Sequence, residues 1–140
     1  MILLDTNVMS EPLRHAPEPR VIAWLDAQPM ETLFLSAITV AELRAGVALL
    51  PAGKRRTALQ DNLETRVLPL FAGRVLPFDA AGGLIWARLM AEGKAIGRPR
   101  SALDMIIAAV AEANGCIVAT GNEKDFVGIE IFNPLRWDRA

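Results

Sequence analysis

The sequence has 140 residues, of which 52% are hydrophobic and 22% are charged, and its formal net charge is −1. This length suffices for one domain with a full core, residues 1–140, and the balanced charge excludes a general basic field that would attract nucleic acid. The apolar content predicts surface that a partner covers, either a second copy or another chain. The alternative is a core that is simply rich in alanine and leucine.

The cysteine and histidine content excludes several classes of protein. The one cysteine, Cys116, allows no disulfide within the chain, which is typical of a cytoplasmic protein. The one histidine, His15, lies in a stretch with proline and arginine that is typical of a loop. Ribonucleases with paired histidines, Ser-His-Asp hydrolases and multi-histidine zinc sites are therefore not expected. Any catalysis would have to depend on acidic residues and a metal ion.

No targeting or membrane segment is expected. The N-terminus contains an acid, Asp5, and lacks a basic run, so it does not resemble a signal peptide. No apolar stretch approaches the ~20 residues that are needed to span a bilayer. Both observations agree with a cytoplasmic location.

Short apolar runs alternate with helical patterns along the chain. Strands are expected at residues 2–4, 33–35, 74–78, 117–119 and 130–132. Helices are expected at residues 7–13, 21–27, from a cap at Ser36 or Thr39 to Leu50, from Lys54 to a stop at Pro69, 79–93 and 101–114. Strands alternating with helices indicate right-handed crossovers and an α/β fold. Its sheet should be mainly parallel, with about five strands, and covered on both faces.

Acidic and amide residues fall where these elements meet. Asp5 ends the first strand, Glu42 lies in the early turns of the helix after the second strand, and Asn122 and Asp125 follow the fourth strand. The C-terminal ends of parallel strands share one edge of a sheet, where α/β folds bind ligands. Asp104 lies in the first turn of a helix that leads into the fourth strand, so this helix has to reach across to the same edge.

Carboxylates that converge on one edge repel one another and raise one another's pKa values. A divalent cation such as Mg²⁺ or Mn²⁺, which prefers oxygen ligands and can activate water, would remove this conflict. The spacing of the acids therefore predicts an acidic metal site. Each acid also has a purely structural interpretation: Asp5 as a helix N-cap, Glu42 and Asp104 in capping boxes with Thr39 and Ser101, and Asp125 as a solvated loop residue.

These motifs, in this order, resemble the PIN-domain ribonucleases, especially the VapC/FitB-type toxins of type II toxin–antitoxin systems. The similarity lies in residues 2–11 (ILLDTNVMSE), 36–46 (SAITVAELRAG) and 97–126, with shorter matches at 76–79 and 132–134. The resemblance implies a three-layer α/β/α sandwich. It also implies an endoribonuclease that hydrolyses RNA, such as tRNA or another structured RNA, with Mg²⁺ or Mn²⁺.

The resemblance also implies roles for individual residues. The catalytic acids and metal ligands of the family correspond to Asp5, Glu42 and Asp104. The fourth ligand corresponds to Asn122 or Asp125, and Thr6, Asn7 and Thr120 correspond to residues that orient the site. One departure is Gly121, where family members commonly have arginine or another polar residue, so one phosphate contact is missing.

RNA and protein partners must be bound locally, because the chain has no general basic field. Arg44, Arg98 and Arg100 are the cations best placed along the sequence for phosphate contacts. Family toxins are silenced by a cognate antitoxin and usually form homodimers, or heterotetramers and larger assemblies with the antitoxin. The apolar surplus is consistent with both, and the helices containing Trp24 and Leu25, or Leu59 and Leu63, are candidates for the grooves involved.

Three other functions share part of this pattern. A haloacid-dehalogenase-like phosphatase needs a second Asp two residues after its nucleophile, whereas position 7 here is Asn. A non-catalytic PIN-like module, which binds a partner or helps to repress its operon, is disfavoured because all three acids are present. A DNA-directed nuclease would carry the same acids, so the sequence does not separate it from a ribonuclease.

Overall fold

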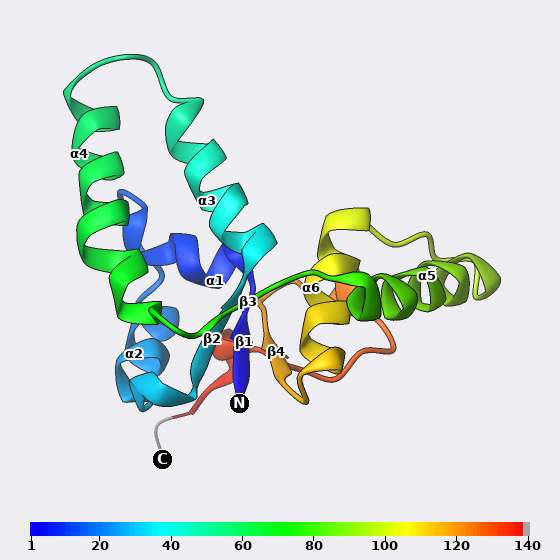
Figure 1. Ribbon diagram of the computed structural model, residues 1–140. Coiled ribbons are helices and arrows are strands. Elements are labelled where there is room, and N and C mark those ends of the chain that lie inside the picture. Colours follow the sequence, from blue (N-terminus) through cyan, green and yellow to red (C-terminus); the bar gives the residue numbers. More distant parts are fainter. Residues whose placement is uncertain (139–140) are drawn as a thin grey trace.

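The computed structural model describes residues 1–138 of the chain. Within that range, five strands form one sheet in the order β3-β2-β1-β4-β5, and every pair of neighbours is parallel (Figure 1). The strands are β1 (Ile2–Leu4), β2 (Leu33–Ser36), β3 (Val75–Leu76), β4 (Ile117–Ala119) and β5 (Ile131–Phe132). The predicted parallel sheet of about five strands is confirmed, and its central strand is the apolar run at the N-terminus.

Helices cover both faces of this sheet, as predicted. They are α1 (Thr6–Ser10), α2 (Pro19–Ala27), α3 (Ala37–Ala48), α4 (Lys54–Asn62), α5 (Ala80–Ala95) and α6 (Ala102–Ala113). The side chains of Ser36, Asp79 and Ser101 accept hydrogen bonds from backbone N–H groups of α3, α5 and α6. Of the two caps predicted for α3, Ser36 is the actual N-cap, and Thr39 lies inside the helix.

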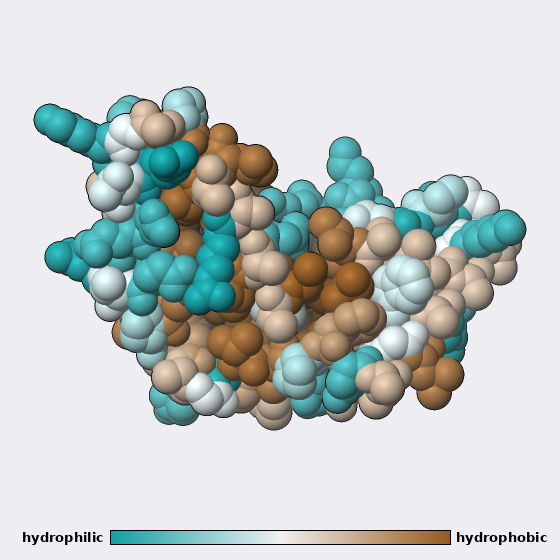
Figure 2. Space-filling view, turned by 45° about the horizontal axis from the view of Figure 1, so that its top comes forward, coloured by the Kyte–Doolittle hydropathy of each residue, from teal (hydrophilic) through white to brown (hydrophobic). Residues whose placement is uncertain are grey.

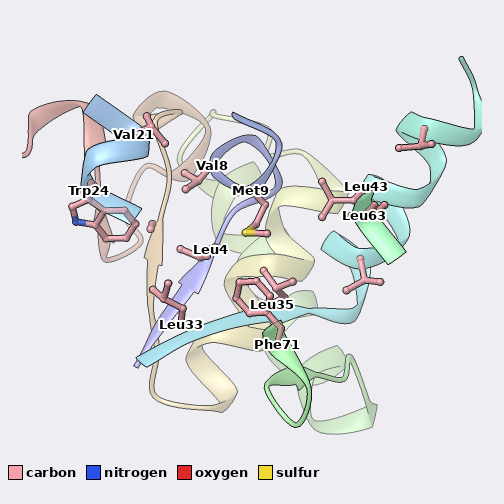
Figure 3. Close-up of a cluster of buried hydrophobic side chains, with 13 residues drawn as sticks. Leu4, Val8, Met9, Val21, Trp24, Leu33, Leu35, Leu43, Leu63 and Phe71 are labelled. Carbon is pink, nitrogen blue, oxygen red and sulfur yellow. The ribbon is translucent and has the colours of Figure 1, made fainter. Parts of the chain in front are cut away.

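The sheet separates two clusters of buried apolar side chains, because successive residues of a strand point to opposite faces. Leu4 belongs to the cluster under α1, α2 and α3, which Figure 3 shows around Met9 and Leu35. Leu3 belongs to the cluster under α5 and α6, together with Met105. The short β1 therefore anchors both halves of the core, and the residue that follows it, Asp5, has a fixed position.

The structure departs from the predicted elements around β3. The expected helix end at Pro69 is wrong, because α4 continues into a π-helical turn (Leu63–Val67) and a 3-10 turn (Leu68–Phe71). Pro69 lies at the start of the 3-10 turn, where the N–H group that proline lacks needs no helical partner. The strand predicted at residues 74–78 is reduced to Val75–Leu76 at the edge of the sheet.

Several large apolar side chains are exposed, in agreement with the surplus in the composition. Leu49 at the end of α3 and Leu84 on α5 are 85% and 77% exposed. Figure 2 shows apolar side chains gathered on the face between the α3–α4 pair and α5. Two of the residues named for partner grooves lie elsewhere: Trp24 and Leu63 are buried in the core, and Trp24 stacks on Phe132. No helix within residues 1–138 is both long and apolar enough to cross a membrane.

Candidate active site

Asp5 is the buried centre of the candidate site. It is the N-cap of α1, directly after β1, and only 2% of its surface is exposed. Its Oδ1 accepts a hydrogen bond from the Thr6 backbone N–H at 2.8 Å, and its Oδ2 accepts one from the Thr120 hydroxyl at 2.7 Å. Both the structural and the chemical interpretations of Asp5 are thus compatible with this position, since the cap bond leaves the carboxylate at the edge of the sheet.

Burial raises the pKa of Asp5 from its ordinary value of 3.8 to about 6. The hydrogen bond from Thr120 opposes this shift, and the negative charges of Asp104 and Glu42 add to it. The influence of these two charges shows that residues far apart in the sequence come together around Asp5. A perturbed carboxylate in such a position is a typical feature of functional sites.

Glu42 is joined to Asp5 through Thr6, whose backbone N–H binds Asp5 and whose hydroxyl belongs to a chain of hydroxyl groups that reaches Glu42. Thr6 Oγ1 donates a hydrogen bond to Glu42 Oε1 at 2.8 Å and lies 3.2 Å from Thr39 Oγ1. The Ser36 hydroxyl lies 3.1 Å from Thr39 Oγ1. Each hydroxyl can thus donate to the next, so that the chain ends on the Glu42 carboxylate.

The sequence did not assign Ser36 and Thr39 to the site, although both are fully buried there. The alternative, purely structural interpretation of Glu42, a capping box with Thr39 as the N-cap, is wrong. Because Ser36 caps α3 instead, the Thr39 side chain is free to contact Thr6. Ser36 ends β2 and Thr39 lies in the first turn of α3, so their place at the edge that carries the acids could have indicated this role.

Asp104 reaches the same edge because α6 precedes a parallel strand and runs antiparallel to it, so that its first turn lies beside the strand C-termini (Figure 1). The helix that carries Asp104 was expected to reach across to the edge with the other acids, and this antiparallel packing of α6 on β4 explains how it does so. Burial raises the pKa of Asp104, and the charges of Asp125 and Glu42 raise it further. Asp104 also has its backbone N–H bonded to Ser101 Oγ, as the capping interpretation predicted.

The segment after β4 brings two more polar side chains to this edge. Thr120 is fully buried, and its Oγ1 accepts a hydrogen bond from the Asn122 N–H at 3.0 Å while donating to Asp5. Asp125 lies in a 3-10 turn (Glu123–Phe126) and is exposed. Asn7 and Asn122 line a cavity of about 460 Å³ whose acidic lining residues are Glu11 and Glu18, and none of Asp5, Glu42 and Asp104 lines it.

The site contains oxygen ligands suited to Mg²⁺ or Mn²⁺ but no preformed cage. Among residues 1–138, no three acidic, histidine or cysteine side chains lie close enough together to hold a metal ion by themselves. Mg²⁺ is commonly held by one or two carboxylates, with water and substrate phosphate completing its coordination. The mutual repulsion around Asp5 and Asp104 fits such a cation, because positive charge would lower both raised pKa values.

The three arginines predicted to contact RNA differ in their surroundings. The prediction that Arg100 contacts a phosphate group is wrong, because its side chain is 7% exposed and donates to two backbone carbonyl groups. Arg44 is exposed but forms a two-bond ion pair with Glu64, with Nε–Oε1 at 2.7 Å, which RNA would have to displace. Arg98 is exposed and lines a small hollow together with Asp125, so it stays a predicted RNA contact.

Comparison with known proteins agrees with this arrangement. Residues 2–130 match the PIN domain family. The chain is 53% identical to the VapC ribonuclease Y4jK of Sinorhizobium fredii over 142 residues, covering all of both chains. It is 51% identical to Toxin FitB of Neisseria gonorrhoeae over 136 residues, which cover 96% of this chain and 98% of FitB.

A solved structure extends the similarity to three dimensions. The structure of FitAB bound to an IR36 DNA fragment contains a chain that is 48% identical to this one. The two chains superpose with a TM-score of 0.94, over 99% of each. The parallel sheet, the acids at its edge and these relatives lead to one conclusion: the chain belongs to the PIN-domain family, in its VapC/FitB group.

Proposed function

We propose that this protein is a metal-dependent endoribonuclease, the toxin of a toxin–antitoxin pair, and that it hydrolyses phosphodiester bonds of RNA in the cytoplasm. One observation carries the proposal: the carboxylate of the buried Asp5 is close enough to Glu42 and Asp104 for their negative charges to raise its pKa. Within residues 1–138, its hydrogen-bond partners are Thr6 and Thr120, and neither is a cation. The names of the relatives, VapC ribonuclease and Toxin FitB, support the same reaction class.

Asp5, Glu42 and Asp104 would hold Mg²⁺ or Mn²⁺, and either Asn122 or Asp125 would complete the set. The bound cation would lower the pKa of a water molecule and stabilise the charge that develops on the phosphate. Thr120 fixes the Asp5 carboxylate from one side, and Thr6 joins Asp5 to Glu42 from the other.

The remaining polar groups would bind and place the RNA. Asn7 directly follows Thr6 in α1, Asn122 follows Thr120, and both line one cavity, where their amide groups would bind a nucleotide. Arg98 is exposed near Asp125 and would contact a phosphate group. Because the net charge is −1, attraction of RNA must depend on such local cations.

We also propose that a cognate antitoxin protein covers part of the exposed apolar surface and that the toxin forms a homodimer. The similarity to a FitAB complex supports the antitoxin. The strongly exposed Leu49 and Leu84 support apolar contacts with a protein partner.

The first test compares the wild type with Asp5→Asn on total tRNA and on a structured RNA, with Mg²⁺, Mn²⁺ or EDTA. Asparagine can still accept from the Thr6 N–H and donate to Thr120, so the fold should survive the loss of charge. Discrete fragments from the wild type that disappear with EDTA and in the variant are expected. The exposed Asp26→Asn serves as the matched control and should cleave normally.

Failure of folded, antitoxin-free wild type to cleave any RNA would refute the ribonuclease. A non-catalytic module that binds its partner or helps to repress an operon would then explain the structure better, and the FitAB–DNA complex makes this the second candidate. Cleavage of DNA in place of RNA under the same conditions would identify a different nuclease.

A further inference from the structure

Arg100 is a buried cation without a role in the proposed chemistry. It precedes α6, and its side chain is 7% exposed. Nη1 donates to the Leu89 carbonyl in α5 at 2.7 Å, and Nη2 donates to the Val127 carbonyl at 2.8 Å. It forms a long ion pair with Glu92, whose Oε2 lies 3.8 Å from Nη1, and it lines a small hollow together with Asp125. Arg100 therefore links three segments of the chain through one guanidinium group.

The surrounding chain is shaped to admit this side chain. A Cβ added to Gly93 would lie 2.8 Å from Arg100 Cγ and Cδ and 3.0 Å from the Arg98 carbonyl, so a larger residue fits there only if the Arg100 stem moves. Gly128 has φ +82°, and an added Cβ would lie 3.1 Å from Arg100 Nη2. Arg100 Nε is the one buried side-chain nitrogen or oxygen in residues 1–138 that has no hydrogen-bond partner. Such a group is costly to bury, so the site holds Arg100 despite an energetic penalty.

The segments joined by Arg100 carry two acids of the site. Ser101, the next residue, caps α6 and binds the backbone N–H of Asp104. Val127 ends the segment 122–127, which contains Asp125. Because α5 packs on α6 and projects away from the sheet (Figure 1), the guanidinium fastens the acid-bearing loop to this helix pair.

We infer that Arg100 is a positioning residue of the site, which fixes the loop carrying Asp125 against the first turn of α6 carrying Asp104. The inference rests on the proposed metal-dependent function, since the spacing of these two acids matters only if they bind the same cation or substrate. Groups that hold metal ligands in place typically change metal affinity 10–100-fold when they are removed.

The test compares the wild type with Arg100→Met, Arg100→Lys and Gly93→Ala. Methionine keeps the apolar stem and loses both carbonyl contacts, lysine can keep one, and alanine at Gly93 displaces the Arg100 stem. Mn²⁺ binding is measured directly by calorimetry, and backbone amide hydrogen exchange is followed along residues 122–128. We expect Arg100→Met to weaken Mn²⁺ binding about 10-fold or more and to speed exchange in that segment. Arg100→Lys and Gly93→Ala should both fall between it and the wild type.

Arg55→Met is the matched control, because Arg55 is an exposed arginine on α4. It should leave Mn²⁺ binding and exchange unchanged. Wild-type affinity for Mn²⁺ in Arg100→Met, or faster exchange spread evenly over the fold, would overturn the inference, since a merely stabilising residue would behave in that way. If the wild type neither binds Mn²⁺ nor cleaves RNA, the proposed function fails. The exchange measurement then decides separately whether Arg100 holds the loop in place. Unchanged exchange at residues 122–128 in Arg100→Met would refute this role.

Discussion

At the scale of single residues, Asp5 combines burial with hydrogen bonds that favour its charged form. Its pKa is nevertheless raised to about 6, because the loss of hydration outweighs the bonds from Thr120 and Thr6. Between pH 3.8 and about 6 the folded protein therefore binds more protons than the unfolded chain does. The free energy of unfolding falls as the pH rises through this window, so the metal-free protein is less stable at pH 7 than at pH 4 as far as Asp5 is concerned.

Asp5→Asn should remove this penalty. The rise of the pKa to about 6 corresponds to at most about 3 kcal/mol at neutral pH. In urea unfolding with EDTA, we expect the variant to be more stable than the wild type at pH 7 and to lose this advantage near pH 4. The raised pKa of Asp104 should leave part of the pH dependence in place. A variant that is equally destabilised at both pH values would contradict the raised pKa, and Asp26→Asn controls for surface charge.

The acids could be predicted from the sequence because each follows a recognisable boundary. An apolar run that ends in a carboxylate identifies Asp5, and a serine cap three residues upstream places Asp104 in a first turn. Arg100 could not be predicted, because its burial depends on a carbonyl 27 residues later and on a glycine in another helix. Local sequence shows a cation in a loop and gives no indication of what surrounds it.

At the scale of elements, short strands and capped helices were predictable, whereas the continuation of α4 was not. Three apolar residues suffice for β1 and β4 because both lie in the middle of a parallel sheet, covered on both faces. After Asn62 the backbone changes to a π-helical and then a 3-10 turn, which places Leu63 and Phe71 in the core. Tertiary packing selects this path, whereas Pro69 in the sequence suggests that the helical segment ends there, and it continues to Phe71.

One glycine inside a helix and one after a helix provide a test of the backbone, because the same substitution should act in opposite directions. Gly46 lies in α3 with open space around an added Cβ, so Gly46→Ala should stabilise the protein by about 0.5–1 kcal/mol. Gly115 follows α6 with φ +67°, so Gly115→Ala should destabilise it by about 1 kcal/mol. Urea unfolding at one pH measures both. Effects of the same sign would show that one of the two backbone conformations is assigned wrongly.

At the scale of the whole molecule, composition predicted exposed apolar surface but not its position. The apolar stripes of α2 and α4 looked available for a partner, yet Trp24 and Leu63 are needed for the core. The exposed apolar residues instead lie at helix ends and on α5, as Leu49 and Leu84 illustrate. A periodic apolar pattern shows that one face of a helix is covered and leaves open whether the covering comes from the same chain.

The sheet order also determines when this protein can become active during its synthesis. Asp5 is made among the first residues, but its partners at the end of β4 and just after it, the Ala119 carbonyl and the Thr120 hydroxyl, are made more than a hundred residues later. A nascent chain that already contains all three acids therefore lacks the central strand pair and the bonds that hold Asp5. A chain ending at residue 116 should remain unfolded by circular dichroism and cleave no RNA, whereas the full chain folds. The ribosome that makes this nuclease thus completes the polypeptide almost entirely before a functional site exists near its own RNA.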